Sequence, residues 1–322
     1  MKFSWNKLSK PILALAPMEG YTDSAYRQLV KTYTPNVICW TEFTSADALK
    51  YKSRTSQKKI KCDKTEQPLI VQLFGKKPEN FIQAIPYVEN MNAAGIDINM
   101  GCPAKKVVAS EHGSALIKTP ELAAEIVYQV SKNTSLPVSV KTRIGFKEFD
   151  KAKFEKFCLN LEKAGAKLIT VHGRTTKQGY SGKADWKPAY SLKKLLKIPI
   201  IGNGDIDSPE SALSHIETLD GIMVGRATFG NPLLMYHIYK TLHPRSKKLK
   251  RLPDWFELAK KHIKLSVKTK GEKKGMLEMR KHLAAYIKGF PYAAKYRLRL
   301  VQVVSENEAL ALIDEIHKNS LK

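Results

Sequence analysis

The segment Gly95-Ile96-Asp97-Ile98-Asn99-Met100-Gly101-Cys102-Pro103 begins as a short apolar run and ends in a polar turn. The length and composition of its first part predict a buried strand over Gly95–Asn99. A turn with one Gly and one Pro then carries Cys102 beside the amide of Asn99. A structural cysteine is expected inside an apolar run, whereas Cys102 follows one. The segment therefore predicts a strand that ends in a thiol open to a ligand.

Seven similar runs lie on either side of this strand, and amphipathic helical patterns separate them. The eight predicted strands are Ile12–Ala16, Asn36–Trp40, Pro68–Phe74, Gly95–Asn99, Pro137–Lys141, Lys167–His172, Pro199–Gly202 and Gly221–Val224. The predicted helices include Glu79–Asn90, Pro120–Lys132, Asp150–Ala164, Lys187–Leu196, Pro209–Leu219 and Asn231–Leu242. Several of them have a Pro near the first turn, which favours a helix start. Eight strands, each followed by a helix or loop, match the size and order of a (β/α)8 TIM barrel.

A doubly wound α/β sheet is the alternative for such an alternation. It has fewer strands as a rule, and it binds its nucleotide through a Gly-x-Gly-x-x-Gly turn after the first strand. No such turn follows Ile12–Ala16. We therefore predict the barrel.

The alternating pattern stops at a polar, basic link from His243 to Arg251. Beyond it only helices are predicted, at Asp254–Thr269, Lys274–Lys288, Tyr292–Val303 and Glu306–Lys318. Helical spacing predicts an apolar face formed by Leu277, His282, Leu283, Tyr286 and Ile287, with Arg280, Lys281 and Lys288 on other faces. We therefore predict two domains, a barrel over 1–243 and a small, basic, all-helical domain over 244–322.

The charge of the chain points to a polyanionic partner. The formal net charge is +25, which a protein acting on small neutral metabolites has no evident need for. Residues 246–322 hold 19 Lys and Arg against 8 Asp and Glu, a net charge of +11 over 77 residues. A general enrichment in lysine would not concentrate charge at one end. The helical tail is therefore predicted to contact nucleic acid.

Other classes of protein are disfavoured. No apolar run reaches the ~18 residues that span a bilayer, and the polar start, Met1–Lys10, lacks the features of a signal peptide. Cys39, Cys62, Cys102 and Cys158 lie far apart, with no spacing typical of zinc ligands. Cys39 and Cys158 fall on predicted buried faces. We expect a cytoplasmic protein without disulfide, metal or membrane contact.

Polar residues and glycines cluster at the predicted strand ends, where the chemistry of a barrel collects. They are Ala16-Pro17-Met18-Glu19-Gly20, Asn99, Cys102, Lys141, Arg143, His172, Arg174, Asn203-Gly204-Asp205 and Gly225-Arg226, with Gln72 inside the third strand. Glycines after the last two strands, together with helix starts and Arg226, suit a phosphate. Gln72 and Lys141 would stabilise the reduced, anionic ring of a flavin. The set predicts a planar cofactor that carries a phosphate.

These motifs match one family in kind and order. They are Ala-Pro-Met at 16–18, Val-Gln-Leu at 71–73, Asn-Met-Gly-Cys-Pro at 99–103, Lys-Thr-Arg at 141–143, His-Gly-Arg at 172–174, Gly-Asn-Gly-Asp at 202–205 and Gly-Arg-Ala at 225–227. The tail adds Arg280-Lys281-His282 and Lys288-Gly289-Phe290-Pro291. Over nearly its whole length the chain resembles the bacterial branch of the tRNA-dihydrouridine synthases.

The resemblance implies a monomeric, FMN-dependent enzyme that reduces one uridine of the tRNA D-loop to 5,6-dihydrouridine, with NADPH as reductant. The flavin would give a hydride to carbon 6 of the uracil, and Cys102 as general acid would give a proton to carbon 5. The implied flavin-binding residues are Ala16, Pro17, Met18, Gln72, Lys141, His172, Asn203, Gly204, Asp205, Gly225 and Arg226. The implied substrate-binding residues are Asn99, Arg143 and Tyr180 in the barrel and Arg280, Lys281, Lys288, Arg297 and Arg299 in the tail.

Two other functions stay open. A dihydroorotate or dihydropyrimidine dehydrogenase acting on a free pyrimidine would share the flavin residues and the thiol, but the charge of +25 disfavours it. An RNA-binding protein whose barrel has lost catalysis would have no use for Cys102 or Lys141. Activity on free uracil or orotate would indicate the first alternative, and a colourless, flavin-free protein the second.

Overall fold

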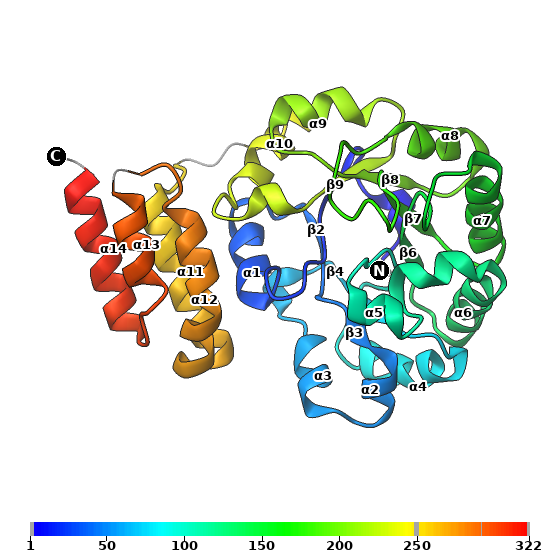
Figure 1. Cartoon of the computed structure of the whole chain (residues 1–322), viewed down its shortest axis with the longest axis horizontal. Coiled ribbons are helices and arrows are strands. Elements are labelled where there is room, and N and C mark those ends of the chain that lie inside the picture. Colours follow the sequence, from blue (N-terminus) through cyan, green and yellow to red (C-terminus); the bar gives the residue numbers. More distant parts are fainter. Residues whose placement is uncertain (1–2, 248–250, 291, 321–322) are drawn as a thin grey trace.

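The structure is a computed structural model that describes residues 3–247, 251–290 and 292–320. Lys248, Leu249 and Lys250 of the predicted basic link, and Pro291 of the tail motif, lie outside the described residues. Figure 1 shows a ring of strands surrounded by helices and, beside it, a stack of helices that ends the chain. Among the described helices, none has the length and apolar composition needed to cross a membrane.

Eight parallel strands close into a barrel. They are β1 (Ile12–Leu15), β2 (Ile38–Trp40), β4 (Leu69–Phe74), β5 (Gly95–Met100), β6 (Val138–Arg143), β7 (Leu168–His172), β8 (Ile200–Asn203) and β9 (Gly221–Val224). β1 pairs with both β2 and β9, and the ring closes where β2 pairs with β4. A two-residue strand, β3 (Thr44–Ser45), adds a further pairing to β4. The predicted TIM barrel is confirmed, and each predicted strand is present with its ends shifted by at most two residues.

Helices cover the outside of the ring (Figure 1). They are α1 (Ser24–Tyr33), α2 (Ala46–Lys50), α3 (Arg54–Lys59), α4 (Pro78–Glu89), α5 (Lys105–Ala109), α6 (Pro120–Asn133), α7 (Lys151–Lys163), α8 (Lys187–Leu195), α9 (Pro209–Ile216) and α10 (Leu234–Leu242). Short 3-10 helices are η1 (Trp5–Lys7), η2 (Lys64–Glu66), η3 (Gly113–Lys118) and η4 (Arg226–Thr228). The six helices predicted by their patterns, α4 and α6 to α10, are all present, and four of them have a Pro in the first turn.

Alternate residues of the strands point into the barrel and out to the helices. In β1, Ile12 and Ala14 belong to the inner apolar cluster, whereas Leu13 and Leu15 belong to the outer one. Cys39 and Cys158 also lie in the outer cluster, as predicted. Because side chains fill the interior, the barrel is a packed core, and a binding site must lie at one of its ends.

Four helices form the tail: α11 (Trp255–Lys270), α12 (Glu272–Tyr286), α13 (Ala293–Leu300) and α14 (Glu306–Ser320). They share an apolar cluster that also takes in Leu29 of α1. Asp23, at the start of α1, forms a buried ion pair with Lys270. The ring of Tyr26 stacks on that of His282 with 5.5 Å between centroids. The tail is therefore joined to the barrel through α1.

The apolar face predicted for α12 is wrong in one of its residues, Leu277. Its side chain is 61% exposed, whereas Met276 and Met279 are buried. One residue turns a helix by about 100°, so the neighbour of a buried residue points away from the core. The other predicted members of the face are buried as expected, namely His282, Leu283, Tyr286 and Ile287.

Candidate active site

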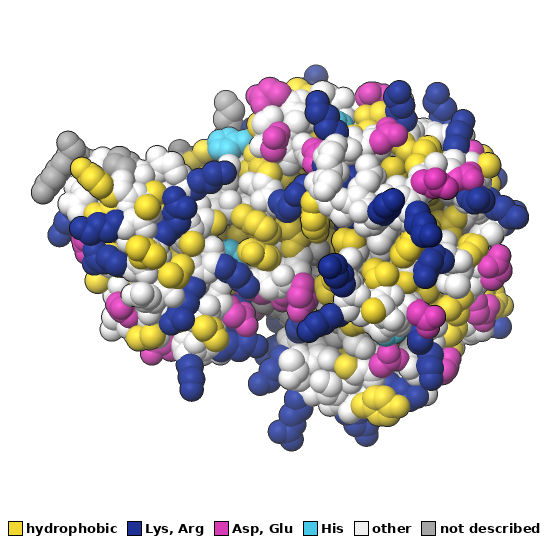
Figure 2. All heavy atoms as spheres, viewed as in Figure 1, with side chains coloured by type: hydrophobic (Ala, Val, Ile, Leu, Met, Phe, Trp, Pro, Cys, Tyr) yellow, Lys and Arg dark blue, Asp and Glu magenta, His cyan; other side chains and the backbone are white. Residues whose placement is uncertain are grey.

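A cavity of about 1220 Å³ opens at the carboxyl end of the barrel strands. Parallel strands bring their carboxyl ends together, so residues far apart in the sequence line one space. The predicted residues that line it are Ala16, Pro17, Met18, Asn99, Cys102, Lys141, Arg143, His172, Tyr180, Asn203, Gly204, Asp205, Gly225 and Arg226. Figure 2 shows Lys and Arg side chains spread over this face of both the barrel and the tail, with apolar side chains gathered between them.

Hydrogen bonds from several elements hold the turn that carries Cys102. The Asn99 Oδ1 accepts from the backbone N–H of Gly101 at 3.1 Å and of Cys102 at 2.9 Å. The Ser114 hydroxyl donates to the carbonyl of Cys102 at 2.8 Å. A Cβ atom at Gly113, where φ is +60°, would lie 3.1 Å from that same carbonyl oxygen, so this close approach requires glycine. The backbone of the turn that carries the thiol is therefore held in place at the cavity.

The electrostatics of Cys102 keep its thiol protonated. Burial raises the pKa of the Cys102 thiol, although the N–H of Ala104 and the charges of Arg143 and Lys141 act in the opposite direction. A nucleophilic cysteine needs a lowered pKa, because its reactive form is the thiolate. The environment of Cys102 favours instead a thiol that can give a proton.

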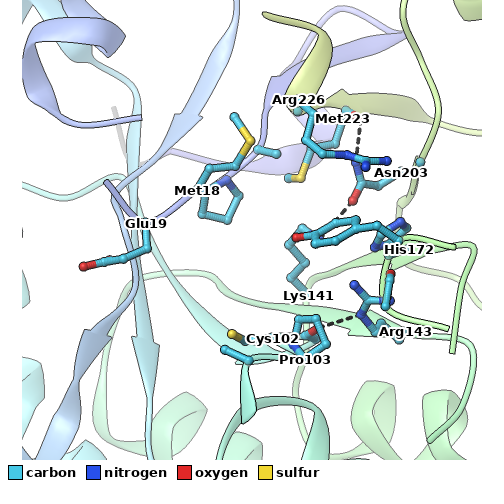
Figure 3. Close-up of a pocket in the computed structure, with 18 of the residues that line it drawn as sticks. Met18, Glu19, Cys102, Pro103, Lys141, Arg143, His172, Asn203, Met223 and Arg226 are labelled. Carbon is cyan, nitrogen blue, oxygen red and sulfur yellow. Dashed lines mark hydrogen bonds between the residues drawn. The ribbon is translucent and has the colours of Figure 1, made fainter. Parts of the chain in front are cut away.

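Three cationic side chains, Lys141, Arg143 and Arg226, line the cavity, and a fourth, Arg174, is buried beside His172. Figure 3 shows Lys141, Arg143 and Arg226 around His172. Burial, with repulsion from Arg143, lowers the pKa of Lys141 to about 8. Burial also lowers the pKa of Arg143 to about 10. Asp205, whose Oδ2 accepts from Arg174 Nη2 at 2.7 Å, offsets part of this charge. The excess of positive charge favours an anionic ligand.

His172 is neutral in this setting. Burial, followed by the charges of the neighbouring cations, lowers its pKa to about 2. Its Nε2 lies 3.5 Å from Nη1 of Arg174, which has hydrogens to donate and cannot accept. Nε2 is therefore assigned as the acceptor and Nδ1 as the protonated nitrogen.

Two links fix the remaining polar groups. Lys141 Nζ donates to Asn203 Oδ1 at 3.0 Å, and Asn203 Nδ2 donates to the Met223 carbonyl at 2.8 Å, which ties β6, β8 and β9 together. Tyr180 is 56% exposed at the rim, with the guanidinium of Arg226 4.4 Å from its ring centroid. Among the described residues, no group of three or more His, Cys, Asp and Glu is arranged to hold a metal ion.

The structure does not bring every predicted residue to the cavity. Gln72 is buried away from it, and its amide bonds to Asp97 and Asn99. The tail residues lie outside it as well, although Lys281 reaches its rim with Nζ 4.9 Å from the ring centroid of Tyr21. Lys288 and Arg297 are exposed. The roles of these residues stay predictions.

Sequence patterns miss several residues that line the cavity. Tyr21 and Phe229 stack at 4.0 Å between ring centroids and form part of its wall, together with Phe43 and Met223. Tyr21 follows the motif after β1, and this position is a signal that could have found it. Met223 lies inside the apolar run of β9, where only the direction of the side chain distinguishes it from a core residue.

Two comparisons with known sequences agree on one family. The sequence model of the dihydrouridine synthase (Dus) family matches residues 14–321. The chain is 36% identical to "Probable tRNA-dihydrouridine synthase 1" of Synechocystis sp. over 93% of this chain and 84% of that protein. It is 38% identical to "Probable tRNA-dihydrouridine synthase" of Rickettsia conorii over 90% of this chain and 88% of that protein. It is 33% identical to the protein of the same name in Staphylococcus aureus, over 97% of this chain and 94% of that protein.

Proposed function

The chain belongs to the dihydrouridine synthase family, and we propose on this basis that it is an FMN enzyme that reduces one uridine in the D-loop of tRNA to 5,6-dihydrouridine, with NADPH as reductant. The observation that carries the proposal is that the Cys102 thiol, whose pKa is raised by burial, faces one large cavity together with a group of cations. At about 1220 Å³, the cavity exceeds the ~300–1,000 Å³ of a typical small-molecule site. It therefore has room for a cofactor and a base together.

The residues of the cavity fit a planar cofactor with a phosphate. Met18 and Met223 offer apolar surface, and Lys141 offers a half-buried cation. Gly204 has a φ of +127°, a conformation that favours glycine, and a Cβ atom there would lie 2.6 Å from the Cβ of Ala184. The side chain of Arg226 is 50% exposed and lies 3.5 Å from Asp205, so its guanidinium can turn to a phosphate. A flavin held there, once reduced by NADPH, would supply a hydride for carbon 6 of the uracil.

Cys102 and Arg143 act on the base. The Cys102 thiol gives its proton to carbon 5, which gains carbanion character when the hydride arrives, and the resulting thiolate is reprotonated from solvent. Arg143 donates to the carbonyls of Gly101, Thr175 and Gly179, which fixes its guanidinium. Its Nη2 amino group is left for a uracil oxygen, where it would stabilise the developing negative charge. Asn99 keeps one amide N–H for the same edge, and Tyr180 walls the base at the rim.

The helical tail is proposed to hold the tRNA. A uracil inside folded RNA must turn out of its stack to enter the cavity, at a cost of a few kcal/mol that phosphate contacts can offset. Residues 244–322 form the RNA-binding domain in this scheme, and 1–243 the catalytic domain. Lys281 supports it, because this tail residue reaches Tyr21 at the rim of the cavity.

The test is the reaction on an unmodified tRNA transcript with FMN and NADPH. Digestion to nucleosides and mass spectrometry should find uridine that has gained one hydride and one proton, at one D-loop position. Free uridine, uracil and orotate are the comparison substrates. Comparable turnover of a free pyrimidine would overturn the proposal in favour of a pyrimidine dehydrogenase. A protein that binds tRNA, does not bind FMN and forms no dihydrouridine would overturn it in favour of an RNA-binding role.

A further inference from the structure

A chain of buried hydrogen bonds runs from the middle of the barrel to the turn that carries Cys102. Asp97 Oδ2 accepts from Gln72 Nε2 at 2.8 Å, and Gln72 Oε1 accepts from Asn99 Nδ2 at 2.9 Å. Asn99 Oδ1 then accepts from the backbone N–H of Cys102 at 2.9 Å. At the inner end, the Ser139 hydroxyl donates to Asp97 Oδ1 at 2.6 Å. The chain starts at a carboxylate and ends at the reactive turn.

The strands set up this chain through their register. Gln72 of β4 lies opposite Asp97 of β5, and Asp97 lies opposite Ser139 of β6. The three side chains thus share one layer of the barrel interior. Asp97, Gln72 and Ser139 are fully buried and Asn99 is 6% exposed, so water does not compete for these bonds. Buried polar groups are costly unless they are bonded, and each of these has its partner.

We propose that Asp97, through Gln72 and Asn99, is a positioning residue for the Cys102 turn. Burial raises the pKa of the Asp97 carboxyl, whereas its hydrogen bonds and the charge of Lys141 act in the opposite direction. In the structure both of its oxygens accept, from Ser139 and from Gln72, so the Gln72 side chain turns its amino group to Asp97 and its oxygen to Asn99. Asn99 must then turn its amino group to Gln72, which leaves its oxygen for the N–H groups of Gly101 and Cys102. The acceptor at one end thereby fixes the direction of both amides.

This inference rests on the proposed role of Cys102 as the proton donor, and it assigns Gln72 a function besides the flavin contact that its motif implies. A competing explanation is electrostatic. Asp97 acts to raise the pKa of Lys141, against the lowering effect of burial and Arg143. In that case the negative charge of Asp97 would matter, and its hydrogen bonds would not.

Replacements at Asp97 separate the two explanations. Asp97→Leu removes the acceptor, and Asp97→Asn removes the charge but keeps an oxygen for Gln72, because the hydroxyl of Ser139 can rotate to accept from the new amide. Gln72→Leu breaks the chain at its centre. The matched control is Thr170→Val in β7, since the buried Thr170 hydroxyl has no hydrogen-bond partner among the described residues.

The measurement is amide hydrogen exchange of the full-length protein, resolved to the peptide that spans residues 99–104, with and without flavin. Asp97→Leu and Gln72→Leu should speed exchange there about tenfold, the effect of losing one net hydrogen bond. Asp97→Asn and Thr170→Val should leave it unchanged. Alkylation of Cys102 by iodoacetamide, followed on the same peptide, should rise in the same two variants.

Two results would overturn the proposal: normal exchange of this peptide in folded Asp97→Leu, or an Asp97→Asn protein that behaves like Asp97→Leu. If Asp97→Leu does not fold, the Gln72→Leu protein decides, because it leaves Asp97 bonded to Ser139. The exchange readout needs neither tRNA nor NADPH, so it stands even if the protein fails to reduce uridine.

Discussion

Replacing Lys281, Lys288 and Arg297 together with Ala should weaken tRNA binding by a calculable amount. The three side chains carry positive charge on the tail, and Lys288 and Arg297 are exposed. Arg280 is left unchanged, because its guanidinium donates to the carbonyls of residues 302 and 303 and so holds the connection between α13 and α14. Arg299 is also left, because it pairs with Glu315 at 2.5 Å.

The expected magnitude follows from counterion release. Each phosphate contact contributes about 0.7–0.9 to the slope of log affinity against log salt concentration, so losing three contacts should flatten the slope by roughly 2.1–2.7. The same relation, taken from 1 M down to 0.1 M salt, predicts an affinity loss of roughly 130- to 500-fold, which shrinks as the salt concentration rises. Flavin reduction by NADPH should be unchanged, because none of the three residues lines the cavity.

The assay is filter binding of tRNA over a salt series. A matched control removes three lysines at the opposite end of the barrel, where Lys163, Lys167 and Lys197 are exposed near the starts of β7 and β8. Both triple variants lose the same charge, so a general electrostatic effect would weaken them equally. An unchanged slope in the tail variant, or equal losses in both, would refute the tail as the RNA-binding surface.

Three further predictions concern the cavity and the join between barrel and tail. Cys102→Ala should lower tRNA reduction by about 10²–10⁴-fold while NADPH still reduces the flavin, as measured by stopped-flow absorbance, since only proton transfer is removed; full turnover would show that another group is the acid. Arg226→Ala should weaken FMN retention in equilibrium dialysis, and binding as tight as in the parent would remove Arg226 from the phosphate site. Burial alone would raise the pKa of Asp23, but Lys270 and nearby hydrogen bonds lower it to about 2. The ionised carboxylate therefore adds about 2 kcal/mol to the free energy of unfolding above pH ~4. This contribution is lost as the pH falls towards 2. Chemical denaturation should give a higher free energy of unfolding for the parent than for Asp23→Asn at neutral pH, and equal values for the two proteins near pH 2. A difference that stays constant with pH would contradict the pKa shift.

Much of the fold could be predicted because its signals are local. Short apolar runs and amphipathic segments of regular length define the strands and the larger helices without reference to distant residues. Helix α1 escapes this pattern for a physical reason. Its residues Arg27 and Lys31 are buried although they are charged, because Arg27 pairs with Glu66 at 2.5 Å and Lys31 donates to backbone carbonyls. The pairing that allows this burial comes from another segment, and no local pattern records it.

Local patterns along the chain were enough to show which residues stand at the strand ends. Because parallel strands in a barrel end on the same side, they also showed that Cys102, Lys141, His172 and Arg226 would meet. What each group can do there depends on its surroundings in the folded barrel. It buries Gln72 against Asp97 instead of in the cavity wall, and it holds His172 neutral. Hydrogen-bond partners and loss of solvent depend on residues that the fold brings together from distant parts of the chain. These features therefore appear only when the barrel has closed.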